Sequence, residues 1–357
     1  MRDRNLLFFD RKRCILMGLS VTLSFAPFLQ AKAQLIPDNT LGKEKSIVNS
    51  SELLQRIDGG AIRGSNLFHS FKEFNIDSGK SVYFNNPGAI ENILTRVTGK
   101  NPSNIFGKLG VLGNANLFLL NPNGIVFGKG ASLDIPGSFN ASTSPGILFD
   151  NSFEFSATNP SSVPLLKVNL TPGLQYPRSQ QGDISNQGSL TVGKDLNFLG
   201  KNIDLNGSLN SGRDLTLKAS DTLQIRDNLN NPFIVNAGRD LLLQANQTID
   251  IFALNHSDSG LFSGNDLILQ SANPVFGDAR YFSGGNFRIE KLDGNLGDLE
   301  SPKDPIIRAS GDVSFDSYRG ASLHILAGGS VDITGNVTIT GADGENGLQE
   351  TVTLSNG

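Results

Sequence analysis

A four-residue phrase, Gly-x-Asp-Leu, recurs through the second half of the chain and limits the folds that this chain can adopt. Full copies begin at Gly193, Gly212, Gly238 and Gly264, and looser copies begin at Gly285, Gly311 and Gly329. The starts lie roughly 18 to 26 residues apart, which is the length of one unit in a solenoid protein. Apolar residues alternate with polar ones after each copy, as at Leu215 and Leu217, and a period of two is typical of half-buried strands.

Units of this kind predict an all-β fold, a parallel β-helix, in which each coil supplies two or three strands around a continuous apolar core. Glycines and the Asp or Asn residues beside them are expected at the corners, where turns need a positive φ and short polar side chains. Roughly 15 coils, spaced by about 4.8 Å, would form a rod of about 70 Å. An up-and-down membrane barrel is the competing fold, but its strands need about 9 to 11 alternating residues and the runs here are mostly shorter.

The first 33 residues differ from the rest of the chain. Basic residues between Arg2 and Arg13 precede an apolar run from Cys14 to Leu29, and a small-x-small sequence follows at 31–33. This order predicts a secretory signal peptide over residues 1–33. A transmembrane anchor is disfavoured, because the run is about 16 residues long and contains Pro27, whereas a spanning helix needs about 20. The only cysteine lies in this leader, so we expect a mature chain without disulfides and without a transmembrane segment.

The region from residue 47 to residue 155 is less regular than the repeats. A short helix is expected over Ser51–Ile57, because its apolar residues share one helical face and glycines follow. Strands are expected at 67–74, 81–84, 93–97, 116–120 and 125–127. In the sequence Asn121-Pro122-Asn123-Gly124, proline presets φ and the next two residues tolerate a positive φ, so a tight turn is expected. We expect this irregular region to cap the end of the solenoid.

The composition argues against several classes of function. Thirty basic and 34 acidic side chains leave a net charge of −4, which argues against a nucleic-acid partner. His69, His256 and His324 lack the short spacings of a metal site. The chain has no Gly-x-Ser-x-Gly elbow, and its glycines near residue 110 lack the Gly-Lys-Ser/Thr of a phosphate loop. No cofactor and no metal are therefore expected.

The aspartates of the repeats leave two interpretations open. They lie at Asp195, Asp214, Asp240 and Asp266. A ladder of bound calcium ions is one interpretation, but the nonapeptide pattern of glycine and aspartate that such sites use is absent. Capping of turns by the short acidic side chain is favoured.

Two stretches carry a specific resemblance to a known family. They are "RGSNLFHSFKEFNI" at 63–76 and "ILTRVTGKNPSNIFGKLGVLGNANLFLLNPNGIVFGKGASLDIPGSFNAST" at 93–143. Their succession resembles the N-terminal secretion domain of filamentous-haemagglutinin-type (TpsA-type) exoproteins of two-partner secretion, especially the cyanobacterial branch. The family motif Asn-Pro-Asn-Gly-Ile is matched by Asn121, Pro122, Asn123, Gly124 and Ile125, and its upstream turn by Asn101, Pro102 and Ser103. The family's Asn-Pro-Asn-Leu motif is absent, because this chain has Asn85-Asn86-Pro87-Gly88 there.

The resemblance implies a right-handed parallel β-helix with a capped secretion domain over residues 34–155. It also implies that the matched motif residues form the address recognised by the periplasmic domains of an outer-membrane transporter. The protein would then pass through the periplasm and across the outer membrane, to the medium or the cell surface. Residues 156–357 would form the β-helix repeat region, which we expect to be truncated at the C-terminus because "TVTLSNG" ends in strand-like alternation without a cap.

Two functions of different classes are compatible with these features. The first is a non-enzymatic exoprotein whose rod acts as a haemagglutinin-like adhesin toward host cells, surfaces or carbohydrate. The second is a carbohydrate-active enzyme, a lyase or glycosidase, with carboxylates converging on one face of the β-helix. The densest acidic group is Glu290, Asp293 and residues 298–300, for which a solvated loop is the favoured explanation. The adhesin is therefore the preferred hypothesis.

Overall fold

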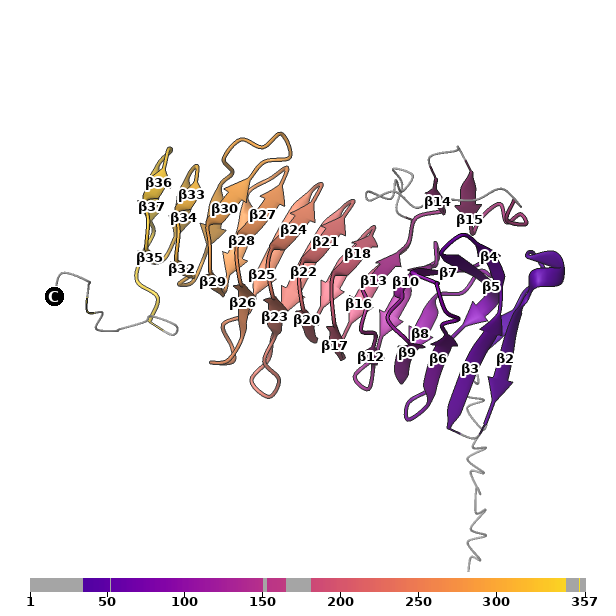
Figure 1. The fold of residues 1–357 in the computed structure, drawn as a ribbon. Helices are drawn as coiled ribbons and strands as arrows, with labels where there is room; N and C mark the ends of the chain where they lie inside the picture. The colour runs from indigo at the N-terminus through magenta and orange to yellow at the C-terminus, as the bar shows by residue number, and fades with distance from the viewer. Residues whose placement is uncertain (1–34, 52, 150–152, 165–180, 345–352, 354–357) are drawn as a thin grey trace, which may run out of the picture. The chain divides into compact units, whose positions relative to one another are not determined.

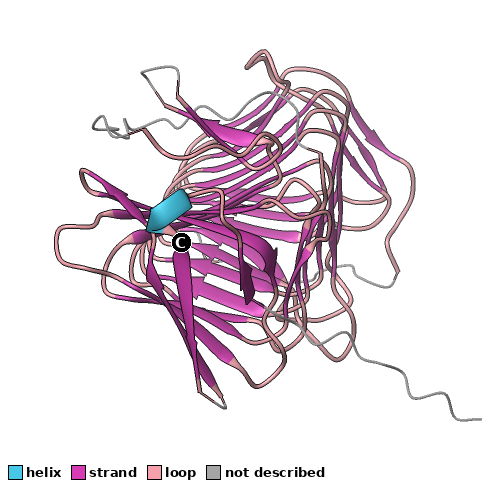
Figure 2. Cartoon of the chain, turned by 90° about the vertical axis from the view of Figure 1, so that its right-hand side faces the viewer, coloured by secondary structure: helices cyan, strands magenta, loops and turns pink. Residues whose placement is uncertain are grey.

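The computed structural model describes residues 35–51, 53–149, 153–164, 181–344 and residue 353. The predicted signal peptide and most of the final "TVTLSNG" stretch lie outside these ranges. The described chain winds from its indigo end to its yellow end through successive coils whose strands lie side by side (Figure 1). Figure 2, a view along the stack, shows how the strands of successive coils overlie one another around a common interior.

The strands form three long faces, because each coil contributes one strand to each face. Sheet A contains β1 (Leu35–Pro37), β4 (Ala61–Arg63), β5 (Asn66–Phe74), β7 (Asn92–Val97), β10 (Asn116–Leu120), β13 (Phe139–Ser142), β18 (Leu196–Gly200), β21 (Leu215–Ala219), β24 (Leu241–Ala245), β27 (Leu267–Ser271), β30 (Phe287–Glu290), β33 (Val313–Phe315) and β36 (Val331–Ile333). Sheet C contains β8 (Ser103–Ile105), β11 (Ile125–Phe127), β16 (Ile184–Asn186), β19 (Ile203–Leu205), β22 (Thr222–Arg226), β25 (Thr248–Phe252), β28 (Val275–Asp278), β31 (Leu299–Ser301), β34 (Tyr318–Gly320) and β37 (Val337–Ile339).

The third face is shared by two sheets that follow each other along the stack. Sheet B contains β2 (Ser46–Ser50), β3 (Leu54–Gly59), β6 (Ser81–Asn85), β9 (Lys108–Leu112) and β12 (Ser132–Asp134). Sheet D contains β17 (Ser189–Val192), β20 (Ser208–Ser211), β23 (Ile234–Ala237), β26 (Gly260–Ser263), β29 (Arg280–Ser283), β32 (Ile306–Ala309) and β35 (His324–Ala327). A bridge between Ile135 and Val192 joins the two sheets.

Alternation along each strand builds the core. In sheet A, the register aligns one inward residue of each coil with that of the next, and this column is buried throughout: Leu67, Ile93, Leu117, Phe139, Leu196, Leu215, Leu241, Leu267, Phe287 and Val313. Each coil therefore covers the apolar face of its neighbour, as a solenoid requires. The predicted parallel β-helix is confirmed. In the described residues, the parallel stack of sheet A has eleven strands, from β5 to β36, which is fewer than the roughly 15 coils expected. Strands β14 and β15 and several long loops use described residues outside the coils.

Antiparallel strands close the N-terminal end. Strand β1 pairs with β5, β2 pairs with β3, and β4 pairs with β5, all antiparallel, whereas β5 and β3 also begin the parallel stack. These pairings cover the first coil and form the predicted cap. The helix expected over Ser51–Ile57 is wrong, because β3 begins at Leu54 and the 3-10 turn η1 (Gly42–Glu44) lies elsewhere. The residues from Leu54 onward form a strand instead, in which Ile57 is buried and Leu54 is exposed.

A second apolar cluster lies outside the coils, on the outer face of sheet A. The antiparallel pair β14 (Gly146–Leu148) and β15 (Glu154–Ser156) covers outward residues of β5, β7 and β10. Phe68 and Phe155 meet edge to face at 5.0 Å between ring centroids. We call residues 154–164 the strap, because they fasten this cluster over the N-terminal coils.

Buried arginines hold the strap in place. The Arg96 guanidinium is fully buried, donates to the carbonyls of Ser156 and Ser161, and lies 4.5 Å above the Phe155 ring. Burial lowers the pKa of Arg96 to about 10, although the Asp38 carboxylate opposes this shift. Arg63 donates to the carbonyls of Val163 and Pro164 and pairs with Glu44 at 2.7 Å. The strap is thus joined to the cap by charge-assisted hydrogen bonds, which are stronger than neutral ones.

Candidate secretion-address site

The two turns singled out in the sequence lie on adjacent coils at one corner, between sheets A and C. Strand β10 ends at Leu120, the turn 121–124 follows, and β11 begins at Ile125. One coil earlier, the turn 101–102 leads from β7 into β8, which begins at Ser103. Because β8 and β11 are paired in parallel, with Ser103 opposite Ile125, the register places the two turns next to each other. We call the eight residues 101–103 and 121–125 the address corner.

Asn121 joins the two turns. Its side chain is completely buried, and its Nδ2 donates to the Asn101 carbonyl at 3.1 Å and to the Ser103 hydroxyl at 3.0 Å. Its Oδ1 accepts the Asn123 N–H at 3.0 Å, which is the Asx turn expected of an Asn at this position. A backbone hydrogen bond from the Gly124 N–H to the Asn121 carbonyl, at 3.1 Å, closes the turn. Asn121 is therefore a structural residue of the corner.

Gly124 is needed for two reasons. Its φ of 117° is disfavoured for any side-chain-bearing residue, and a Cβ there would lie 3.1 Å from the Asp183 carbonyl oxygen of the following coil. The Ile125 N–H donates to that same carbonyl at 3.0 Å. Pro122 and Ile125 are buried. The following coil thus packs directly on the turn.

Three residues of the address corner are exposed, namely Asn101, Pro102 and Asn123. The Asn123 Nδ2 donates to the Gly99 carbonyl at 2.8 Å, and the Asn101 Nδ2 donates to the Glu73 carboxylate at 2.9 Å. These bonds hold the exposed amides in fixed positions. Sequence reasoning missed Gly99, Glu73 and Asp183, since only the coil register brings them to the corner.

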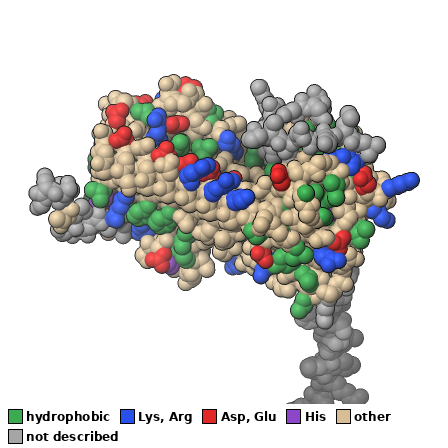
Figure 3. Space-filling model, viewed as in Figure 1, with side chains coloured by type: hydrophobic (Ala, Val, Ile, Leu, Met, Phe, Trp, Pro, Cys, Tyr) green, Lys and Arg blue, Asp and Glu red, His purple; other side chains and the backbone are tan. Residues whose placement is uncertain are grey.

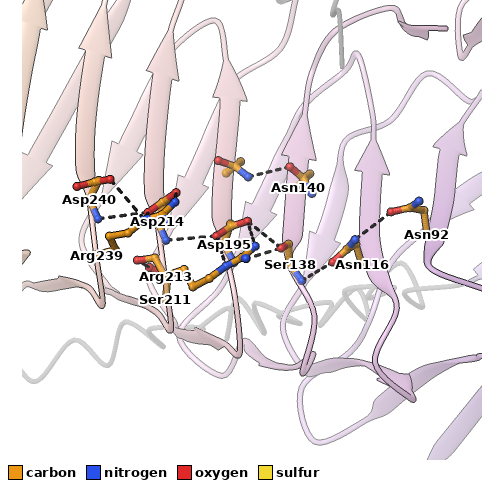
Figure 4. Close-up of polar contacts among 11 residues, drawn as sticks. Asn92, Asn116, Ser138, Asn140, Asp195, Ser211, Arg213, Asp214, Arg239 and Asp240 are labelled. Atoms are coloured by element: carbon orange, nitrogen blue, oxygen red, sulfur yellow. Dashed lines mark hydrogen bonds and ion pairs between the residues drawn. The ribbon is translucent and has the colours of Figure 1, made fainter. Parts of the chain in front are cut away.

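The Gly-x-Asp-Leu repeats form a second regular feature, at the corner that precedes each strand of sheet A. Each aspartate accepts a backbone N–H from the same position one coil later: the distance is 3.3 Å from Asp214 N to Asp195 Oδ1, from Asp240 N to Asp214 Oδ1, and from Asp266 N to Asp240 Oδ1. The ladder continues through Asn286, Asp312 and Ser330, and it begins with Asn92, Asn116 and Ser138. Figure 4 shows the first part of the ladder, from Asn92 to Asp240.

The residue before three of these aspartates, namely Arg213, Arg239 and Asn265, adds a side-chain contact to the preceding coil. Arg213 donates to both oxygens of Asp195, at 3.0 and 2.6 Å, and Arg239 pairs in the same way with Asp214 (Figure 4). The hydrogen bond from Arg239 lowers the pKa of Asp214. Turn capping was the favoured interpretation of these aspartates, and the structure refines it, since the caps connect successive coils. In the described residues, no group of three or more His, Cys, Asp or Glu side chains could hold a metal ion.

The repeat glycines have a different role from the one expected. Gly193, Gly212, Gly238 and Gly264 are absent from the described residues with positive φ, so the predicted left-handed conformation is wrong. They are small because the coils touch there: a Cβ on Gly212 would lie 2.2 Å from the Gly193 carbonyl oxygen, and one on Gly238 would lie 2.4 Å from that of Gly212. Glycine is therefore required at these positions by the close approach of two backbones, and not by a positive φ.

The acidic residues considered for an enzyme are occupied by separate local contacts. Glu290 pairs with Arg288 at 2.9 Å, and Asp293 accepts the N–H and side chain of Asn295. Asp298 accepts the Ser317 N–H of the next coil at 3.2 Å. The three carboxylates thus stabilise a loop and a corner. In the ranges that the structure describes, no helix is both long enough and apolar enough to cross a membrane.

A parallel β-helix with an antiparallel cap and an Asn-Pro-Asn-Gly corner defines the class of protein to which this chain belongs. The family model described as "TPS secretion domain" matches residues 33–289, and the chain belongs to this family of two-partner secretion exoproteins. The match extends to both sides of residue 155, so the domain boundary predicted at that residue stays a prediction. Membership of the cyanobacterial branch also stays a prediction.

Particular relatives are more distant. The heme/hemopexin-binding protein of Haemophilus influenzae is 41% identical over 66 residues, which are 18% of this chain and 7% of that protein. The secretion domain of HMW1 from Haemophilus influenzae shares 15% identity with a TM-score of 0.45, over 85% of this chain and 100% of that one. The filamentous hemagglutinin secretion domain shares 18% identity with a TM-score of 0.36, over 86% of this chain and 98% of that one. The chain thus spans only a small part of the curated relative that it matches.

Proposed function

We propose that the address corner is the part of this exoprotein that its outer-membrane transporter recognises in the periplasm. The observation that carries the proposal is that the buried Asn121 side chain bonds to Asn101 and Ser103, 20 and 18 residues earlier, and so joins the two family motifs into one surface. The exposed amides of Asn101 and Asn123 and the ring of Pro102 would be the groups read by the transporter. After export across the outer membrane, the repeat region would present its faces for adhesion, as a non-enzymatic rod.

The first test separates recognition from folding. The double variant Asn101→Ala, Asn123→Ala removes two exposed side-chain amides and leaves Asn121 in place, so the fold should persist. We expect export from a Gram-negative host that carries the cognate transporter to fall about tenfold, the factor for roughly 1.4 kcal/mol of lost binding. Quantitative immunoblots of medium and periplasm measure this, and circular dichroism of the purified variant checks its β content.

Asn273→Ala is the matched control. Asn273 is exposed at the same type of corner five coils later, and its Nδ2 donates to the Gln247 carbonyl of the preceding coil at 2.9 Å, as that of Asn123 does to Gly99. Its export should equal that of the wild type. Equal export of the double variant would contradict the proposal and leave the corner with a structural role alone. Asn121→Ala should instead destabilise the address corner by about 2 kcal/mol, because it leaves buried partners unsatisfied, so its export defect is not diagnostic.

A further inference from the structure

A polar groove lies where the strands of sheet C end, whereas the address corner lies where they begin. Two long loops bound this groove along the stack, namely residues 128–131 after β11 and residues 227–233 after β22. Between these loops the chain leaves sheet C within two residues, at 187–188 and again at 206–207. Figure 1 shows the loop before β23 projecting from the lower edge of the stack. The groove has a volume of about 540 Å³, and the secretion function leaves it without a role.

The floor of the groove is made of backbone. The Asn186 side chain is fully buried, accepts the Gly188 N–H at 3.0 Å and donates to the Gly188 carbonyl at 3.3 Å. A Cβ on Gly188 would lie 2.6 Å from the Ala131 carbonyl oxygen, and one on Gly207 would lie 2.2 Å from the Gly188 carbonyl oxygen. Because a side chain would clash at either glycine, the groove stays open and its floor is fixed.

The side chains along the groove are almost all polar. Apart from Pro232, they carry amide, hydroxyl or ammonium groups: Gln187, Asn206, Asn228, Asn231, Ser189, Ser208 and Lys129. Amides and hydroxyls both donate and accept hydrogen bonds. The described lining contains no carboxylate, and the nearby Asp204 accepts the Asn206 Nδ2 at 3.2 Å. In Figure 3, the tan of uncharged polar side chains and backbone covers most of the middle of the visible face.

Several polar groups of the groove are free to bind a ligand. In the part of the chain that the structure describes, neither the Lys129 ammonium nor the Gln187 side-chain amide has a partner. Asn228 Oδ1 accepts the N–H groups of Asn230 and Asn231 at 3.0 and 3.1 Å, and the Asn231 Nδ2 at 3.2 Å. These bonds fix the turn and leave the Asn228 Nδ2 and the Asn231 Oδ1 unpaired among the described residues.

An exposed aromatic ring lies at the N-terminal end of the groove. Phe106, at the corner after β8, is 39% exposed. Its ring lies over Gly128, where a Cβ would be 2.3 Å from the Phe106 Cδ1, and Gly128 leads directly to Lys129. Among the described residues, no second aromatic ring and no cation packs on this ring. One side of Phe106 is therefore open to a ligand.

We infer that this groove binds an oligosaccharide of 2-acetamido sugars, with a pyranose ring against Phe106 and acetamido groups on the free side-chain amides. The inference rests on the proposed adhesive role of the rod and specifies its location and ligand. A side-chain amide matches an acetamido group, because it donates to the carbonyl and accepts from the N–H. Lys129 supplies further donors for hydroxyl oxygens, and Pro232 supplies an apolar surface for an acetamido methyl group.

Peptides and polyanions fit this groove less well. A peptide that adds a strand needs an open sheet edge, but β20 is paired on both sides, and β17 pairs with β20 and is bridged to sheet B through Val192. An anchoring peptide side chain needs an apolar pocket, and Pro232 is the one apolar side chain other than glycine in the described lining. A polyanion needs several cations, and Lys129 is the one cation in that lining.

The test is calorimetric titration of the purified chain with chitotetraose and cellotetraose, two tetrasaccharides with the same linkage. Chitotetraose carries an acetamido group on each ring where cellotetraose carries a hydroxyl. We expect chitotetraose to bind at least about tenfold more tightly, because cellotetraose leaves the amides of the groove without their matching groups. Gln187→Ala should weaken chitotetraose binding about tenfold and reduce its advantage over cellotetraose, and Phe106→Ala should weaken binding of both sugars about fivefold.

Matched controls lie outside the groove. Gln247 is an exposed glutamine at a corner between sheets A and C, and its side chain has no partner among the described residues. Phe276, on sheet C, is 39% exposed, as Phe106 is. Gln247→Ala and Phe276→Ala should bind chitotetraose as the wild type does. Equal binding of the two sugars, absence of chitotetraose binding, or equal weakening by Gln247→Ala would overturn the inference.

The binding assay is independent of the proposed function. It uses purified protein, so its failure is distinguishable from a failure of the address corner, which only the export assay reports. Attachment of the exported protein to surfaces tests the adhesive role separately. A chain that binds chitotetraose without attaching to surfaces would contradict the adhesive role and support the sugar site.

Discussion

Replacing Gly238 by Ala should lower the free energy of unfolding by about 3 kcal/mol, at the upper end of the range for overpacking. The new Cβ would lie 2.4 Å from the Gly212 carbonyl oxygen, and a backbone group cannot turn away as a side chain can. The coils would have to separate there. That movement would strain the hydrogen bonds from Gly238 N to Ser211 O at 3.0 Å and from Arg239 N to Arg213 O at 2.9 Å.

Chemical denaturation of the purified protein, followed by circular dichroism, measures this effect. Gly88→Ala is the control, because a Cβ at Gly88 meets no atom within 4 Å and its φ is not positive. This variant should match the wild type to within about 0.5 kcal/mol, or exceed it slightly through reduced freedom of the unfolded chain. Equal behaviour of Gly238→Ala and Gly88→Ala would show that the coils adapt to a Cβ and that their close contact is not a constraint.

Acidification from about pH 7.5 to about pH 5 should destabilise the N-terminal cap by roughly 2 kcal/mol through His69. His69 is fully buried, its Nδ1 lies 3.1 Å from the Ser46 hydroxyl, and its ring is 5.3 Å from that of Phe84. Burial lowers the pKa of His69 from 6.5 to about 3, although the Asp58 carboxylate opposes the shift. The folded state therefore keeps the ring neutral, while the unfolded state takes up a proton below its pKa of about 6.5.

Protonation of His69 in the unfolded state lowers the free energy of unfolding as the pH falls. The unfolded state binds more protons between about pH 6.5 and pH 3, so stability is full above that window and falls as the pH decreases through it. Amide hydrogen exchange of β5 and β7 at several pH values locates the effect in the cap, because stability in a solenoid is local. His69→Asn should remove most of the pH dependence above about pH 5, whatever its overall stability, whereas His256→Gln should keep it. A pH dependence that survives in His69→Asn would assign it to other groups.

The repeats could be predicted from the sequence because the same short-range rule applies in every coil. Alternation located β10 and β11 at their observed bounds, Asn116–Leu120 and Ile125–Phe127, and the repeated leucines became the inward column. The strands of the cap were harder to predict, since the apolar spacing of Leu53, Leu54 and Ile57 fits one face of a helix as well as the end of a strand. Pairing with β2, which is a tertiary event, decided for the strand.

The strap illustrates what local patterns leave undetermined. A charged residue such as Arg96 in a strand is ordinarily a sign of exposure, and its burial depends on acceptors some 60 residues later, at Ser156 and Ser161. The address corner was found as two separate turns, because turn chemistry is local. Its assembly by Asn121 depends on the parallel register of β8 and β11, which no single motif encodes.

The rungs between the coils have a direction. Asp195 lies on the earlier coil and accepts from the later N–H of Asp214, and Asp214 in turn accepts from Asp240. Arg213 and Arg239, on the later coils, reach back in the same sense. A completed coil therefore displays vacant acceptors to the segment that follows it in the chain, and serves as its template. This direction belongs to the side-chain rungs alone, because the backbone bonds at the same corner run the other way: the Leu215 N–H of the earlier coil donates to the Asp240 carbonyl of the later coil at 2.9 Å.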